Sequence, residues 1–298
     1  MRDQGLGAPS RDEAPRLGPA GTIDWSGWAE RLLLRLKLTD ANVLLLYSFA
    51  LFVIAGVQRF LDDSSLDALL EFNAGEILAL CAIYSLVTAK TGVITLSRID
   101  FAVISACALL MLAPVSQHFA FLGAGLAGLY FVIHYPRRAA LAQVGQLWLA
   151  IACYESFGRL FFKLVSAPLM QAELSMIALI GPPLGFPVSK DGIRLVSPDG
   201  WFIFMLERCS AFHNISLAIL MWLSFLKLAS AEAERPQFAA LGIAVLSIFL
   251  LNEWRMLLMT PSPTAFYFWH GGAGALLFSC AAFFAVAVPT ALSLRRPA

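Results

Sequence analysis

Long apolar runs separated by short polar segments dominate the chain. A helix needs roughly 20 mostly apolar residues to cross hydrocarbon about 30 Å thick. Eight runs approach this length and predict an all-α polytopic membrane protein with eight transmembrane helices. The runs are Asn42–Val57, Ala74–Ala89, Ile99–Val115, Phe119–Tyr135, Leu141–Phe161, Ser210–Leu228, Phe238–Trp254 and His270–Leu292.

The long segment before the sixth predicted helix has a different pattern. "SAPLMQAELSMIALIG" predicts an amphipathic or partly inserted helix that stops at Gly181, Pro182 and Pro183. "FPVSKDGIRLVSPDGWFIFML" then alternates polar and apolar residues around two Asp-Gly pairs, which is typical of short strands joined by tight turns. We therefore expect a small extracytoplasmic strand-and-turn element that leads directly into Cys209.

These patterns divide the chain into five parts. Residues 1–41 form a cytoplasmic tail, 42–161 the first five helices, 162–209 the extracytoplasmic segment, 210–292 the last three helices, and 293–298 a second cytoplasmic tail. Within the first part, "DWSGWAERLLLRLKL" (Asp24 to Leu38) resembles an interfacial helix on the anionic inner leaflet. An extension of the first membrane helix explains the same stretch equally well. No apolar signal-peptide core precedes it, so the first helix is expected to be the targeting signal.

Composition and charge agree with a membrane protein and give its orientation. Hydrophobic residues make up 59% and charged residues 14% of the chain, and the mean hydropathy of +0.75 excludes an ordinary soluble domain. With the N-terminus in the cytoplasm, fourteen of the 21 basic residues fall on the inside. The positive-inside rule then places both termini in the cytoplasm of a cell whose inner membrane the protein spans. There is no basic stripe with interleaved aromatics, so no nucleic-acid partner is expected.

One of the five cysteines differs from the rest in its position. Four lie within apolar runs, where cysteine is usually a small buried hydrophobe. Cys209 opens the sixth predicted helix, Arg255 closes the seventh, and His270 opens the eighth. Because successive membrane helices alternate in direction, these three residues should lie at one membrane face, which is the outer face in the predicted orientation.

The three residue types together match the chemistry of thiol acyl transfer. The start of a helix and nearby cations favour the thiolate, histidine can act as general base and then acid, and arginine can stabilise an oxyanion. His213 lies one helical turn after Cys209 and is a rival base. Each residue also has a plainer explanation: a structural cysteine, an arginine that reaches the lipid headgroups, and a histidine of an aromatic belt.

Three short motifs resemble those of the exosortase and archaeosortase family of membrane transpeptidases. They are "CSAFHN", with Cys209 and Ser210, "NEWR", with Asn252 and Arg255, and "FWHGGAG", with His270. The resemblance covers the chain from about Leu164 to Leu292. It departs from the family at Ala211, where a glycine is usual.

The resemblance implies a function and roles for individual residues. Cys209 would be the nucleophile, Arg255 the stabiliser of the oxyanion or substrate, and His270 the acid and base, with Ser210, His213 and Asn252 as possible supporting residues. The substrate would be an exported protein with a C-terminal sorting signal made of a short motif, a membrane helix and a basic tail. The enzyme would cleave at the motif, form a thioester, and pass the protein to an amine or lipid acceptor. No metal or organic cofactor is required for that chemistry.

Two other functions fit the same composition. A transporter or flippase could use Arg255 and Glu253 to bind an anionic substrate, although internal repeats typical of transporters are not evident. A non-catalytic scaffold for envelope assembly is the third alternative.

Overall fold

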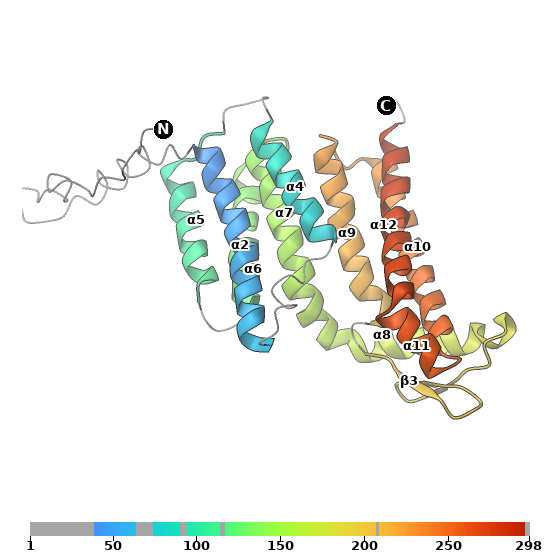
Figure 1. Cartoon of the computed structure of the whole chain (residues 1–298). Helices are drawn as coiled ribbons and strands as arrows, with labels where there is room; N and C mark the ends of the chain where they lie inside the picture. Colours follow the sequence, from blue (N-terminus) through green and yellow to red (C-terminus); the bar gives the residue numbers. More distant parts are fainter. Residues whose placement is uncertain (1–38, 64–73, 90–93, 114–116, 207–208, 296–298) are drawn as a thin grey trace, which may run out of the picture.

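The computed structural model describes residues 39–63, 74–89, 94–113, 117–206 and 209–295. The first half of the described chain is a helical bundle (Figure 1). Its helices are α2 (Asp40–Asp63), α4 (Ala74–Thr88), α5 (Arg98–Met111), α6 (Gln117–His134) and α7 (Ala140–Ala152). The interfacial helix expected at residues 24–38 lies outside the described residues.

The membrane character predicted from the sequence is supported, and the number of spans stays a prediction. Within the described residues, the helical stretches Asp40–Gln58, Arg235–Met259 and Ala273–Leu294 are long and apolar enough to cross a membrane. Large apolar side chains also point away from the bundle, such as Leu109 at 71% exposure and Ile133 at 69%. Exposed apolar surface of this extent fits a lipid environment.

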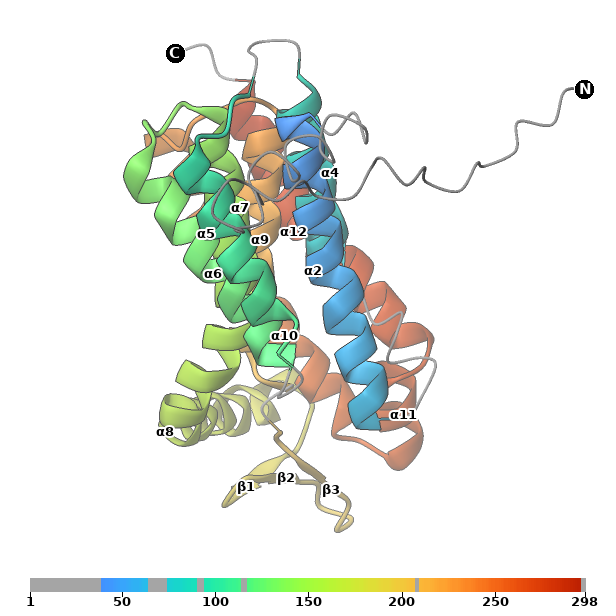
Figure 2. The same cartoon turned by 90° about the vertical axis from the view of Figure 1, so that its left-hand side faces the viewer.

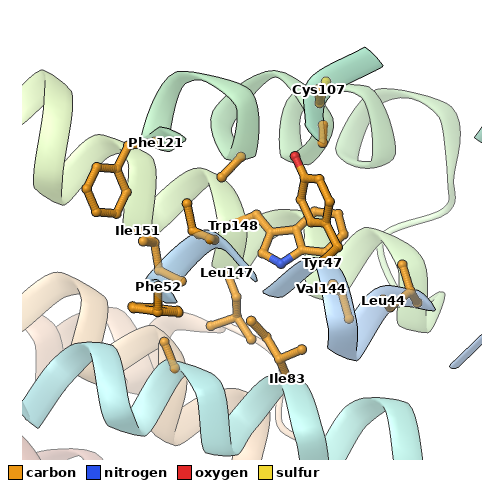
Figure 3. Packing of buried hydrophobic residues seen from close by; sticks show 14 of the residues in the cluster. Leu44, Tyr47, Phe52, Ile83, Cys107, Phe121, Val144, Leu147, Trp148 and Ile151 are labelled. Carbon is orange, nitrogen blue, oxygen red and sulfur yellow. The ribbon is translucent and has the colours of Figure 1, made fainter. Parts of the chain in front are cut away.

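Trp148 of α7 forms the centre of the bundle core. Its ring lies 4.6 Å from that of Tyr47 and 5.6 Å from that of Phe131. The indole Nε1 donates to Ser48 Oγ at 2.9 Å, and the Ser48 hydroxyl donates to the carbonyl of Leu44 at 2.8 Å. The buried indole therefore has the hydrogen-bond partner that its N–H requires. Figure 3 shows the surrounding apolar side chains from α2, α4, α6 and α7.

The chain turns out of the bundle after α7. Residues Cys153–Phe157 form a π-helix, and α8 (Gly158–Ile180) continues from it. In both views α8 lies across one end of the bundle (Figures 1 and 2). The fifth membrane helix was expected to continue to Phe161, whereas the regular α-helix of α7 ends at Ala152. A π-helical turn adds a residue to the helical repeat and is a common place for a helix to change direction.

The predicted strand-and-turn element is present beside α8. A short 3₁₀-helix (Pro182–Leu184) is followed by β1 (Ser189–Asp191), β2 (Arg194–Val196) and β3 (Phe202–Phe204). The strands pair antiparallel in the order β1-β2-β3, and the Asp-Gly turns place Gly192 and Gly200 at positive φ. Leu195 and Ile203 face each other across the sheet and are buried.

Four helices complete the described chain: α9 (Ala211–Leu228), α10 (Arg235–Met259), α11 (Pro263–His270) and α12 (Ala273–Leu294). The placement of His270 at the start of the eighth membrane helix was wrong. His270 instead ends the separate short helix α11, and α12 begins only after Gly271 and Gly272. Two consecutive glycines, which are the weakest helix formers after proline, separate the two helices.

Candidate active site at the end of the bundle

Cys209 lies immediately before α9, within the packed core of the strand-and-turn element. Its side chain is 9% exposed and belongs to a cluster with residues of α8, the sheet and α10: Leu174, Ile177, Val188, Leu195, Ile203, Met205, Met256, Leu257 and Met259. Its N–H donates to the carbonyl of Leu206 at 2.8 Å. The cysteine therefore lies between the sheet and the N-terminus of α9.

Ser210 is the N-cap of α9. Its Oγ accepts from the N–H of Phe212 at 3.3 Å, and the residue is fully buried. Serine is favoured at this position because its oxygen satisfies one of the free N–H groups of the first turn. The residue that follows the cysteine thus starts the helix.

Asn252 of α10 holds the backbone of Cys209 from the other side. Its Nδ2 donates to the Cys209 carbonyl at 2.9 Å, and its Oδ1 accepts from Asn214 Nδ2 of α9 at 3.0 Å. Asn252 is 1% exposed. A buried amide that both donates and accepts fixes α9 against α10 at the height of the cysteine.

Glu173 of α8 is a residue of this site that the sequence interpretation missed. Its Oε1 accepts from Ser210 Oγ at 2.9 Å. Burial raises the pKa of Glu173 to about 7, although the Ser210 hydroxyl and the nearby backbone N–H of Ala211 act in the opposite direction. The sequence does carry a signal for Glu173: it is the single acidic residue within the apolar stretch "PLMQAELSMIALI". A charge in such a stretch is costly unless it has a partner, so the residue was a candidate for a specific contact.

Arg255 joins the end of α10 to α11. Its Nε donates to the carbonyl of Trp269 at 3.0 Å and its Nη2 to the carbonyl of His270 at 3.3 Å. The guanidinium also lies 4.7 Å from the ring centre of Phe278 in α12, and it is close enough to Cys209 for the two groups to interact electrostatically. Arg255 therefore connects the end of α10 to α11 and α12.

His270 is exposed at the end of α11. Its ring stacks on Phe266 with centres 4.7 Å apart. Partial desolvation, followed by the positive charge of Arg255, lowers the pKa of His270 below its ordinary value. The imidazole is therefore largely neutral at pH 7, which is the form that accepts a proton.

Other residues named from the sequence are only partly described. The side chain of His213 lies outside the described residues. Glu253 of α10 is 2% exposed, and neither of its carboxylate oxygens bonds to a described protein group. No group of three or more His, Cys, Asp or Glu side chains in the described part of the chain could hold a metal ion.

The arrangement brings a thiol, a guanidinium and an imidazole to one end of the bundle. This is the end at which α8 and the sheet lie (Figure 2), whereas α2 begins and α12 ends at the other (Figure 1). No family model, curated protein or solved structure matches the chain.

Proposed function

We propose that the protein is a membrane-embedded cysteine transpeptidase or protease of the exosortase and archaeosortase type. The observation that carries the proposal is the position of Arg255. Its side chain bonds to the backbone of His270 and interacts electrostatically with Cys209. Both interactions support a common site for three residues that lie up to 61 positions apart in the sequence. The motifs around these residues were the basis of the family resemblance.

The proposed reaction begins at Cys209. The imidazole of His270 takes the thiol proton, and the sulfur attacks the carbonyl carbon of the scissile peptide bond. The resulting oxyanion is stabilised by Arg255, whose guanidinium has five N–H donors and uses two of them to hold α11. Collapse of this intermediate breaks the C–N bond, and His270 returns its proton to the departing amine. A thioester on Cys209 remains.

The second half of the reaction reverses the proton transfers. An acceptor amine, or water in the hydrolytic case, attacks the thioester carbonyl while His270 removes the proton of the acceptor. The sulfur leaves as the thiolate and regains a proton. The chain's own residues supply all of the acid–base steps.

The position of the site suits a substrate that is anchored in the membrane. Cys209 lies next to the end of a helical bundle with an apolar outer surface, beside a sheet that is outside the cell in the predicted orientation. A C-terminal sorting signal, with its cleavage motif just before an apolar helix, would present the scissile bond at that height. We infer an exported protein with such a tail as substrate and an amine or lipid as acceptor.

The proposal is tested by co-expression with a protein that carries a motif, an apolar helix and an Arg-rich tail at its C-terminus. Processing is followed by gel mobility for wild type and for Cys209→Ala, Arg255→Ala and His270→Ala. We expect Cys209→Ala to abolish processing, and the other two variants to reduce it by about 100-fold or more. Membrane content is measured for each variant.

His213→Ala serves as the comparison variant because it removes the rival base. Retention of processing in this variant, with loss in His270→Ala, assigns the proton transfers to His270. The opposite result assigns them to His213. Processing by Cys209→Ala of a substrate that the wild type cleaves would overturn the proposed function.

A further inference from the structure

We propose that Glu173 is a positioning residue for the nucleophile: its carboxylate, supplied by α8, holds the first turn of α9 and thereby fixes the direction of the Cys209 side chain. The inference rests on the proposed function, because only a reactive cysteine needs such control. Glu173 would not touch substrate. It acts through Ser210 and Ala211.

The first support is the pattern of hydrogen bonds around the cysteine. Glu173 Oε1 accepts from Ser210 Oγ at 2.9 Å, and the N–H of Ala211, the first residue of α9, lies near enough to favour the charged carboxylate. The Ser210 hydroxyl can then use its lone pairs for the N–H of Phe212, at 3.3 Å. One carboxylate therefore orients the Ser210 hydroxyl, and the Ser210 oxygen satisfies a free backbone donor of the helix start.

The second support is that another helix, α10, holds the adjoining backbone through Asn252. Its amide donates to the carbonyl of Cys209 at 2.9 Å, whereas Glu173 holds the two residues that follow. Ser210, Asn252 and Glu173 are at most 3% exposed. The backbone from the Cys209 carbonyl to the start of α9 is thus held by buried side chains from two different helices.

The third support is electrostatic. The N-terminus of a helix carries a partial positive charge, which favours a carboxylate placed at its first turn. Glu253 of α10, a second buried carboxylate, interacts electrostatically with Glu173. Ser210 is the described residue whose hydrogen bond to the Glu173 carboxylate is observed.

When Glu173 is replaced, we expect alkylation of Cys209 and processing of substrate to change in opposite directions. Cys209 is 9% exposed in the structure, in which Glu173 holds the first turn of α9. When the contacts of Glu173 are lost, the first turn of α9 can move. The Cys209 thiol then becomes accessible to small reagents and leaves the geometry that the reaction requires. Misplacement of a reacting group by about 1 Å can cost on the order of 100-fold in rate. Alkylation of Cys209 should therefore rise while processing falls.

The test compares Glu173→Gln and Glu173→Leu with wild type in detergent at pH 8, where the wild-type carboxylate is ionised because its pKa is about 7. Alkylation by iodoacetamide is followed by mass spectrometry of the peptide that contains Cys209. Glu173→Gln keeps one acceptor oxygen and Glu173→Leu keeps none. We expect processing to fall about tenfold in the first and about 100-fold in the second, with KM little changed, and alkylation to rise in the same order.

Asp100→Asn is the matched control. Asp100 is also a buried carboxylate that accepts a backbone N–H at a helix start, but it lies at the start of α5. Its substitution should lower thermal stability without changing the alkylation of Cys209. Glu173→Leu with wild-type alkylation and wild-type processing per folded molecule would overturn the inference. If the wild type processes no substrate at all, the proposed function fails, and the alkylation measurement still decides whether Glu173 holds the turn.

Discussion

Arg255 and His270 influence one another at the residue scale through both charge and hydrogen bonding. The guanidinium donates to the His270 carbonyl, and its charge opposes protonation of the imidazole. The same arginine that would stabilise an oxyanion therefore also keeps the proposed base in its neutral form. A substitution of Arg255 should therefore affect both the oxyanion and the protonation of His270.

Replacement of Arg255 by glutamine should raise the pKa of His270 toward its ordinary value. One of the two causes of the lowered pKa, the nearby positive charge, is removed, while partial desolvation remains. The titration is measured by NMR of histidine-labelled protein in detergent, with His270→Gln to assign the signal among the four histidines. Arg194→Gln removes a cation from β2 and should leave the titration unchanged. An unaltered or lower pKa in Arg255→Gln would contradict the electrostatic coupling.

At the element scale, α6 and α7 approach each other through two glycines. A Cβ atom at Gly128 would lie 2.6 Å from the carbonyl oxygen of Gly145, and one at Gly145 would lie 2.8 Å from the carbonyl oxygen of Gly128. Both contacts are with backbone, which cannot move aside as a flexible side chain can. Small residues at helix contacts are typical of membrane bundles because they allow close packing.

We expect Gly128→Ala and Gly145→Ala each to destabilise the protein by roughly 1–3 kcal/mol, the usual cost of overpacking. Thermal unfolding in detergent, followed by tryptophan fluorescence, gives the change in Tm. Gly242→Ala in α10 is the control, because nothing lies within 4 Å of a Cβ at that position. Alanine should raise the Tm there, since glycine within a helix costs about 0.5–1 kcal/mol relative to alanine. An unchanged Tm in both α6–α7 variants would show that the two helices can separate without loss.

At the scale of the whole molecule, the proposed site and the sheet lie at one end of the bundle, and the start of α2 and the end of α12 lie at the other (Figure 1). The excess of basic residues in the segments predicted to be inside predicts that the first end is extracytoplasmic. The orientation determines whether the site can meet exported proteins at all.

Reporter insertions test this orientation directly. Alkaline phosphatase inserted at Gly192, in the turn between β1 and β2, should be active because it reaches the outside. The matched insertion at Ser230, in the turn between α9 and α10, should be inactive because it remains in the cytoplasm. Activity at Ser230 without activity at Gly192 would invert the orientation and place the cysteine inside the cell.

Local signals in the sequence were sufficient for several features of the fold. The two Asp-Gly pairs predicted the turns at Gly192 and Gly200, and both turns are present. Gly181 and the following prolines predicted the end of α8 at Ile180. These signals act over a few residues, through the φ angles that glycine and proline allow.

The sequence alone determined the helical membrane character, the strand-and-turn element before Cys209, and the expectation that Cys209, Arg255 and His270 share a face, since that follows from the alternation of helices. Tertiary structure decided that α8 lies across the end of the bundle, that His270 ends a helix of its own, and that Glu173 reaches the first turn of α9. Glu173 and Ser210 are 37 positions apart. No local pattern encodes such a contact, because it depends on how α8 packs against helices far along the chain.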